Sequence, residues 1–435
     1  MPSPRGDAST QPLFSEAHAK DLDARDPLAS FRARFHVPPG PGGEPLIYFS
    51  GNSLGLQPRS APERVAREME AWARMGGAAH FKEEDPWYRY HESLAAPLAR
   101  LAGALPSEVV AMNSLTVNLH LMMATFYRPR PGRAAVVMED RAFPSDAYAV
   151  QTHLRSRGID PDEEILIVRP AGGRPCPSTE DFEALLEREQ GRIALVLLGG
   201  VNYATGQAFD LGRIAAAAKR LRLTLGVDLA HAIGNVPLQL HDWGIDFAVW
   251  CSYKYLNGGP GAAGGCFVHA AHAGDLSLPR LGGWWGNDPA TRFEMRPDFV
   301  PRPGADGWQL SNPPVLALAP LKASLEIFEE AGMDALRAKS VSLTSCLEAS
   351  LASLGGACEL ITPRDPAARG CQLSLRFASR ARAVHQALAE RGIVADFREP
   401  DLIRVAPVPL YNRFEEVLRF SRILAGIVGP SAPEA

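Results

Sequence analysis

The residues whose types and spacing most clearly suggest a chemical function lie between positions 246 and 268. Residues 247–251 form a short apolar run with the length and the aromatic and β-branched content of a buried strand. Lys254 follows between two tyrosines, and five glycines then come within eight residues. Such neighbours solvate an ammonium group poorly, and this favours the neutral amine that forms Schiff bases. The alternative is a lysine whose stem lies on apolar surface while its charge reaches water.

A carboxylate closes the strand predicted before this one. Residues 223–227 read as a buried strand and end at Asp228, which Leu229, Ala230 and His231 follow. An aspartate at the end of a buried strand is costly unless a cation pairs with it. Lys254 comes 26 residues later, after one more strand. The two side chains, on successive strand ends, would face opposite ends of one small ring.

Two further strand ends offer an anion site and an aromatic ring. Leu115 and Thr116 follow the strand-like run 109–112 and begin a helix, whose free N–H groups could hold an anion. An ordinary helix cap is the alternative for Thr116. Phe143 follows the strand-like run 134–138 and could stack on a flat ring, whereas a phenylalanine at a strand end is usually part of the core.

These side chains together match the requirements of pyridoxal phosphate (PLP). This cofactor needs a lysine for its aldehyde, a carboxylate for its pyridine nitrogen, a stacking ring and a phosphate cradle at a helix start. The carboxylate keeps the pyridine protonated, so that the ring can accept the electrons of a carbanion. No metal is expected, because the six cysteines show no CxxC pattern and no histidine-rich spacing. Reduced thiols without a disulfide framework are expected instead.

Alternating strands and helices from residue 109 onward must position this site. Runs such as 194–198 are apolar throughout, which indicates strands buried on both faces of a mainly parallel sheet covered by helices. Such sheets bind ligands at the carboxyl ends of their strands. The predicted strands cover residues 109–112, 134–138, 165–168, 193–198, 223–227, 247–251 and 266–268, and the helices between them cover 116–127, 145–157, 179–189 and 211–221.

The ends of the chain have a different character. Residues 15–35 are helix-like within a polar arm that a Pro/Gly-rich break at 38–43 interrupts, and a further helix is predicted over 58–75 and another over 88–104. Long helical patterns at 315–331 and 333–354 lead into a smaller unit of strands and helices. We predict an N-terminal arm (1–44) that packs with a small domain, a large PLP-binding domain (45–320) and a small C-terminal α+β domain (321–435).

Composition excludes several classes of protein. The chain has 435 residues, 46% of them hydrophobic and 22% charged, which is typical of a globular protein. A net charge of −4 without a basic block gives no reason to expect nucleic acid or membrane as a partner. The N-terminus lacks the apolar core of a signal peptide, and no run of 18 apolar residues occurs. A cytoplasmic location is expected.

Motifs along nearly the whole chain resemble those of the kynureninase family, within the fold type I, class V aminotransferase-like PLP enzymes. The most specific pair is DLAHAIGNV at 228–236 followed by HDWGIDFAVWCSYKYLN at 241–257. The other matches, in order, are SGNSLGL at 50–56, LTVNLHLMM at 115–123, FPSD at 143–146, TGQ at 205–207, SNPP at 311–314 and RVAPVPLYN at 404–412. The resemblance implies a large domain with a mainly parallel seven-stranded sheet and a smaller C-terminal α+β domain.

The resemblance also implies roles for individual residues. Lys254 resembles the lysine that holds PLP as a Schiff base, and Asp228 the partner of the pyridine nitrogen. Tyr253 resembles a phosphate ligand and is the candidate acid that protonates the substrate Cβ. The other implied cofactor-binding residues are Leu115, Thr116, Phe143, Pro144, Ser145, Asp146, His231, Trp284 and Asn312.

A homodimer with its active site at the interface is implied as well, with Trp284 and Asn312 contributed across that interface. Arg404 resembles the arginine that binds the substrate α-carboxylate, as a bidentate guanidinium can. Ser53 is a further expected substrate contact. His80 and Asn312 fall where animal-type members carry His and Asn, which favours a pocket that accepts the ring hydroxyl of 3-hydroxykynurenine.

One departure concerns a cofactor hydrogen bond. Gly199 and Gly200 stand where relatives commonly carry a hydroxyl residue, so that a backbone group or water would have to replace it.

The activity that this resemblance implies is hydrolytic β,γ-cleavage of L-kynurenine or 3-hydroxy-L-kynurenine. The products would be L-alanine and anthranilate or 3-hydroxyanthranilate, in tryptophan degradation or NAD biosynthesis. Two alternatives remain at this point. One is another fold type I PLP enzyme, such as a cysteine desulfurase or an aminotransferase, although the cysteines fall mostly in predicted strands and helices. The other is a catalytically silent PLP-fold binding protein, which the intact Lys254, Asp228 and Arg404 disfavour.

Overall fold

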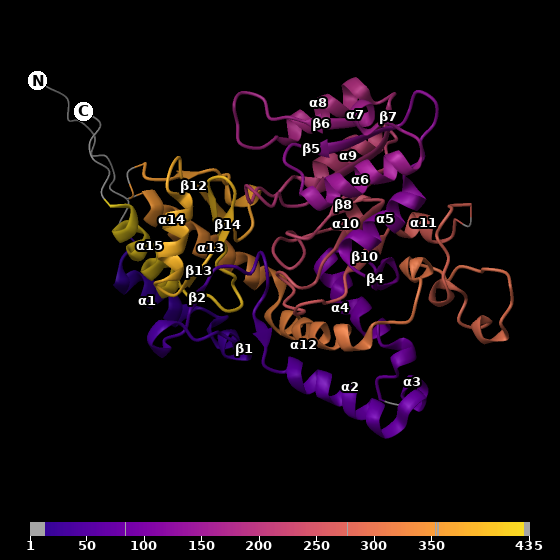
Figure 1. Ribbon diagram of the computed structural model, residues 1–435, viewed down its shortest axis with the longest axis horizontal. Coiled ribbons are helices and arrows are strands. Elements are labelled where there is room, and N and C mark those ends of the chain that lie inside the picture. The colour runs from indigo at the N-terminus through magenta and orange to yellow at the C-terminus, as the bar shows by residue number, and fades with distance from the viewer. Residues whose placement is uncertain (1–13, 83, 276, 353, 355, 430–435) are drawn as a thin grey trace, which may run out of the picture.

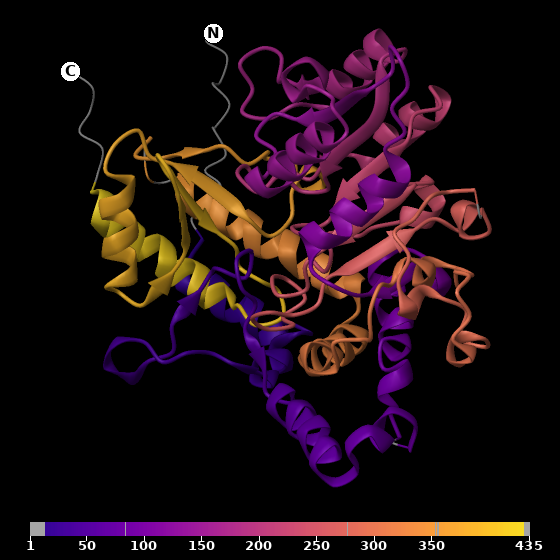
Figure 2. The same ribbon diagram turned by 45° about the vertical axis from the view of Figure 1, so that its right-hand side comes forward.

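A computed structural model describes residues 14–82, 84–275, 277–352, 354 and 356–429. Its largest element is a seven-stranded sheet with the order β4-β10-β9-β8-β7-β5-β6 (Figures 1 and 2). The strands from β9 to β6 are parallel, and β10 is antiparallel to both of its neighbours, which confirms the predicted sheet. The strands are β4 (Val109–Ala111), β5 (Ala135–Glu139), β6 (Ile165–Val168), β7 (Ile193–Gly199), β8 (Leu225–Asp228), β9 (Phe247–Trp250) and β10 (Gly265–Val268).

Alternate residues of the central strands pack into two separate hydrophobic cores. In β9, Ala248 and Trp250 belong to one core, and Phe247 and Val249 belong to the other. Because both faces are buried, the strand reads as an unbroken apolar run. One face is covered by α5 (Leu115–Phe126) and α6 (Pro144–Ser156), and the other by α4 (Glu92–Ala102), α8 (Thr179–Glu189), α9 (Leu211–Arg220) and α12 (Val315–Ala331).

A four-stranded antiparallel sheet forms the centre of the smaller unit, with the order β11-β12-β15-β14. Its hydrophobic core also takes in Phe14 and Ala19 from the N-terminal arm and Ile47 and Phe49 from the segment that follows. The elements around this core are α1 (Glu16–Arg25), β2 (Ile47–Tyr48), α13 (Met333–Ala352), β11 (Glu359–Leu360), β12 (Leu373–Arg376), α14 (Ala381–Ala389), β13 (Ile393–Val394), β14 (Asp396–Arg398), β15 (Leu402–Val405) and α15 (Phe414–Val428).

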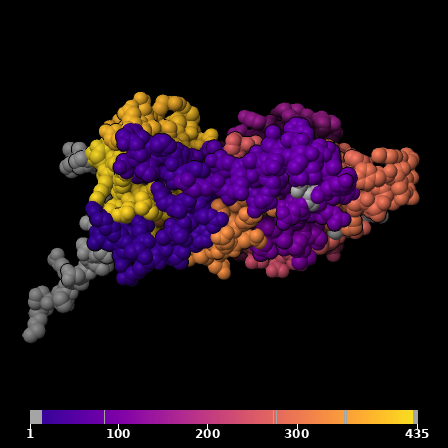
Figure 3. Space-filling view, turned by 90° about the horizontal axis from the view of Figure 1, so that it is seen from below, coloured from indigo at the N-terminus to yellow at the C-terminus, as the bar shows by residue number. Residues whose placement is uncertain are grey.

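Helix α12 connects the two units, as Figure 1 shows. The predicted domain boundary at 320 falls inside this helix, and Leu318 and Leu325, one on each side of it, pack in the core of the large sheet. Leu343 and Leu347 of α13 pack in the small core instead. Seen from below, residues of the first hundred positions run across the molecule from the smaller unit to the larger one (Figure 3).

The long helix predicted over 15–35 was wrong in one respect. Helix α1 ends at Arg25, and a 3-10 helix follows at Ala29–Arg34. Pro27 disfavours helical geometry for the residue before it, and the Asp26 side chain accepts the N–H of Leu28 at 2.9 Å. The remaining strands and α-helices are β1 (Phe35–His36), β3 (Gln57–Pro58), α2 (Ala61–Met75), α3 (Ala79–Lys82), α7 (Pro161–Glu164), α10 (Leu240–Trp243) and α11 (Ala270–Ala273).

The described helices include none that is long and apolar enough to cross a membrane.

Glycine at position 226 is required by the packing between β8 and β9. A Cβ on Gly226 would lie 2.1 Å from the ring of Phe247, its partner in the strand register. We therefore expect Gly226→Ala to lower the free energy of unfolding by about 2–3 kcal/mol in urea titrations, as overpacking does. Gly191→Ala is the matched control, because a Cβ there meets no atom within 4 Å. Equal effects of the two changes would contradict this account.

Candidate active site

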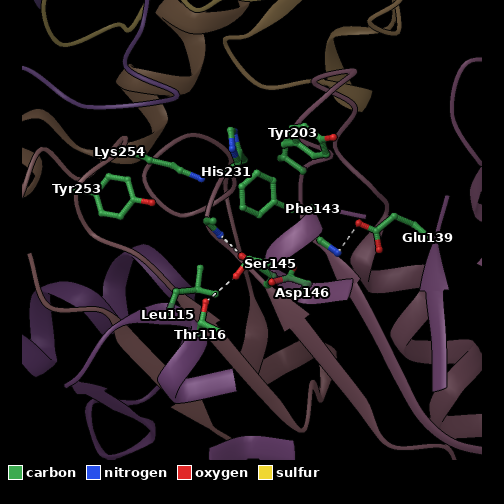
Figure 4. Close-up of a pocket in the computed structure, with 14 residues that line it drawn as sticks. Leu115, Thr116, Glu139, Phe143, Ser145, Asp146, Tyr203, His231, Tyr253 and Lys254 are labelled. Carbon is green, nitrogen blue, oxygen red and sulfur yellow. Dashed lines mark hydrogen bonds between the residues drawn. The ribbon is translucent and has the colours of Figure 1, made fainter. Parts of the chain in front are cut away.

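The carboxyl ends of β5, β7 and β8 and the turn after β9 surround one pocket (Figure 4). Glu139, Gly199 and Asp228 are the last residues of these three strands. Parallel α/β sheets bind ligands at this edge. The pocket is lined by Leu115, Thr116, Glu139, Phe143, Ser145, Asp146, Gly199, Val201, Tyr203, Asp228, Ala230, His231, Tyr253 and Lys254.

Lys254 enters the pocket from a tight turn after β9. The N–H of Gly258 donates to the Ser252 carbonyl at 2.8 Å, and the N–H of Asn257 donates to the Lys254 carbonyl at 3.0 Å. Lys254 is 8% exposed, and its Nζ lies 5.6 Å from the ring centroid of Phe143 and 5.9 Å from that of Tyr253. The amine therefore faces two aromatic rings inside the pocket, as the sequence predicted for a poorly solvated lysine.

Asp228 and Asp146 place two carboxyl groups beside this amine. Asp228 Oδ1 accepts the N–H of Ala230 at 2.6 Å. Burial raises the pKa of Asp228, while the hydrogen bonds from Asp146 and from Ala230 and the charge of Lys254 oppose that rise. Burial and then the neighbouring Asp228 hold the pKa of Asp146 well above its usual range. Asp146 therefore keeps a proton more readily than Asp228 does.

His231 faces the same pocket as a neutral imidazole. Burial, followed by the charge of Lys254, lowers the pKa of His231 well below its usual range. Its Nδ1 is buried and has no hydrogen-bond partner among the described residues. It is therefore free to bond a polar ligand.

Two helix N-termini converge at the side of the pocket nearest to Leu115. Helix α5 begins at Leu115 without a side-chain cap, and α6 begins at Pro144, also without one. The hydroxyls of Thr116 and Ser145, each at the second position of its helix, lie 2.9 Å apart (Figure 4). Uncapped N–H groups at the positive ends of two helix dipoles suit an anion, and the role predicted for Thr116 stays a prediction.

Tyr203 links the pocket to Arg404 of β15. Its ring packs edge-on against Phe143 at 5.1 Å, and its carbonyl accepts a hydrogen bond from Arg404 Nη1 at 2.7 Å. Arg404 is 1% exposed and also pairs with Asp396 at 2.8 Å. Its guanidinium therefore lies one residue behind the pocket wall, and part of its hydrogen-bonding capacity is already used.

The remaining predicted site residues do not line the pocket. Trp284 is 43% exposed, and its Nε1 donates to the Arg292 carbonyl at 3.4 Å. Asn312 is exposed in the segment before α12. The ring of His80, on α3, packs against Trp87 at 5.3 Å. Pro144 is the first residue of α6, beside the pocket.

Ser53 belongs to a loop that touches the lysine turn. The N–H of Gly55 donates to the Tyr253 carbonyl at 2.8 Å, and a Cβ on Gly55 would lie 2.3 Å from the Lys254 carbonyl. Glycine at this position lets the loop approach the turn. Ser53 is half-buried two residues away and does not line the pocket.

Sequence reasoning missed Glu139 and Tyr203. Glu139 had a signal, because it is an acidic residue directly after an apolar strand, as Asp228 is. Tyr203 lies four residues beyond β7 and had no such signal, because its place in the pocket depends on how the loop folds back.

Comparisons with known proteins identify the family. The model of the kynureninase C-terminal domain matches residues 336–424. A kynureninase of Myxococcus xanthus is 54% identical over 95% of this chain and 97% of its own length. A kynureninase of Xanthomonas campestris is 55% identical over 93% of this chain and 96% of its own. This chain belongs to the kynureninase family.

Solved structures agree with this fold at lower identity. A C-DES mutant with glycine covalently linked to its PLP cofactor has a TM-score of 0.76 and 19% identity, over 90% of this chain and 98% of its own. The cysteine desulfurase CsdA of Escherichia coli has a TM-score of 0.75 and 20% identity, over 92% and 98%. These likenesses concern the fold alone. None of the six cysteines of the kynureninase-family chain is exposed.

PLP is the cofactor of this kynureninase-family enzyme, and the pocket fits it. The two uncapped helix N-termini suit a phosphate, the Asp228 carboxylate suits a protonated pyridine nitrogen, and the Lys254 amine suits an aldehyde. His231 Nδ1 is buried without a partner among the described residues, as expected where a polar ligand completes its hydrogen bonds.

Changing Lys254 tests whether this lysine holds the cofactor. Lys254→Ala should lack the visible absorbance that a lysine–PLP Schiff base gives, because no other described amine lines the pocket. Lys322→Ala is the control, since that amine pairs with Asp85 outside the pocket. A visible band that persists in Lys254→Ala after dialysis would show that another amine holds PLP.

Proposed function

We propose that this chain hydrolyses the Cβ–Cγ bond of L-kynurenine or 3-hydroxy-L-kynurenine and releases L-alanine and anthranilate or 3-hydroxyanthranilate. The observation that carries this proposal is identity above 50% with kynureninases over nearly the whole chain. The reaction belongs to tryptophan degradation. A cytoplasmic location also stays a proposal.

When bound, PLP supplies an electron sink for carbanions formed at the substrate amino acid. Lys254 would hold the cofactor aldehyde, and its free amine would remove the proton from the substrate Cα. Its Nζ lies inside the pocket beside the rings of Phe143 and Tyr253. Asp228 stabilises positive charge on the pyridine nitrogen, and Asp146 supports it by holding the shared proton.

Tyr253 is the proposed donor of the proton that Cβ takes up. Burial, followed by Cys251, raises the pKa of Tyr253, so that its hydroxyl keeps its proton throughout the neutral range. Tyr253 also lines the pocket beside the uncapped start of α5. It can therefore contact both a phosphate and a substrate carbon.

A second copy of the chain is proposed to complete the site. Trp284 and Asn312 lie outside the pocket of their own chain, on surface that can reach a partner. Neighbouring residues expose unusual apolar area for a monomer: Phe293 is 52% exposed and Met295 70%. We infer a homodimer in which each copy contributes this segment to the active site of the other.

Arg404 is the proposed anchor for the substrate α-carboxylate, so changing it should affect KM more than kcat. The assay follows the fluorescence of the anthranilate formed from each of the two kynurenines. Arg404→Lys should raise KM by about tenfold or more with a smaller change in kcat, because a forked pair of hydrogen bonds is lost. Arg364→Lys, at an exposed arginine of the same domain, is the control. An unchanged KM would contradict the carboxylate role, and no anthranilate from either substrate would contradict the proposed activity.

His80 and Asn312 are proposed to recognise the ring hydroxyl of 3-hydroxykynurenine. The double change His80→Phe with Asn312→Ala should lower kcat/KM for 3-hydroxykynurenine relative to kynurenine by about tenfold, because the hydroxyl loses its hydrogen-bond partners. The ratio of the two substrates in one preparation controls for folding. An unchanged ratio would refute the assignment.

A further inference from the structure

Glu139, the last residue of β5, has no part in the function proposed above. It is 4% exposed and lines the pocket. Its Oε1 accepts the N–H of Gly199 at 3.2 Å, as Figure 4 shows. Its Oε2 is buried and has no hydrogen-bond partner among the described residues. An unpartnered buried carboxyl oxygen is costly, so its position at the cofactor pocket requires an explanation.

Gly199 makes room for this carboxyl group beside Asp228. In the sheet register, Gly199 of β7 lies opposite Asp228 of β8. A Cβ on Gly199 would lie only 3.1 Å from Glu139 Oε1. Because position 199 has no side chain, Glu139 reaches across β7 towards the strand that carries Asp228.

The charges around Glu139 are mostly negative. Burial is the largest cause that raises its pKa, to about 7, and Asp228 and Asp140 add to the rise, while N–H groups of Glu139 and Gly199 oppose it. The charge of Glu139 in turn contributes to raising the pKa of Asp146 on α6 and the pKa of the Cys176 thiol before α8. The cations nearby are Lys254, which acts on Asp146 and Asp228, and Arg141 and Arg169, which lie 4.0 and 3.9 Å from Asp140.

We propose that Glu139 is a positioning residue of the PLP site, which holds a proton and so leaves Asp228 as the ionised carboxylate reserved for the pyridine nitrogen. Neighbouring buried carboxyl groups cannot all ionise beside one ammonium. This inference rests on the role proposed above for Asp228.

The affinity of the apoenzyme for PLP, measured by equilibrium dialysis at pH 6 and pH 8.5, tests this role. At pH 6, below the pKa of about 7, most wild-type Glu139 is neutral, so wild type and Glu139→Gln should bind PLP within about twofold of each other. At pH 8.5 the wild-type apoenzyme must take up a proton to bind, and its dissociation constant should exceed that of Glu139→Gln by about tenfold.

Glu68→Gln is the matched control, because Glu68 is also 4% exposed but bonds Trp87 Nε1 outside the pocket. Its dissociation constant should match that of wild type at each pH. A ratio between wild type and Glu139→Gln that is the same at both pH values would overturn the role of Glu139. Asp228→Asn separates the two proposals: if it binds PLP weakly while that ratio stays flat, only the role of Glu139 fails. If it binds as tightly as wild type, the role of Asp228 fails.

Discussion

Three buried carboxyl groups, those of Glu139, Asp146 and Asp228, share a pocket with the single amine of Lys254. In water all three carboxyl groups would be ionised at neutral pH, but burial disfavours the charged form of each. Protons must therefore remain on some of them, and the distribution of those protons decides which group can meet a positive ring nitrogen. The ends of parallel strands set this arrangement, because β5 and β8 each terminate in an acid at the same edge of the sheet.

Backbone N–H groups, rather than cationic side chains, are available to meet the negative charge of a phosphate. Helices α5 and α6 both begin at this edge without side-chain caps, and so their first N–H groups remain available for an anion. The pocket thus combines a carboxylate region for a cationic ring atom with a dipole region for a phosphate. Lys254 opens onto the same pocket, with its Nζ 5.6 Å from the ring centroid of Phe143 and 5.9 Å from that of Tyr253.

Local patterns predicted the sheet and most of the pocket, because strand ends and helix starts leave signals that do not depend on distant contacts. Asp228, Lys254 and Thr116 were found in this way. Tyr203 was not, since its position depends on a loop that bonds Arg404 from the other unit. Arg404 itself carried no local signal, and its partner Asp396 becomes visible only when β14 and β15 pair. The predicted first helix ran through Pro27, where the structure breaks it.

Both ends of the chain build the small core: Phe14 and Ile47 pack in the same cluster as Leu375 and Phe420. During synthesis the large sheet can therefore form while the N-terminal segment still lacks the surface that will bury it. The loop at residues 50–55 comes directly after β2, and its Gly55 N–H donates to the Tyr253 carbonyl in the lysine turn. This loop therefore also depends on the small core. A ribosome-bound chain that lacks α15 would therefore carry every residue that lines the pocket, but the small core that supports this loop would be incomplete.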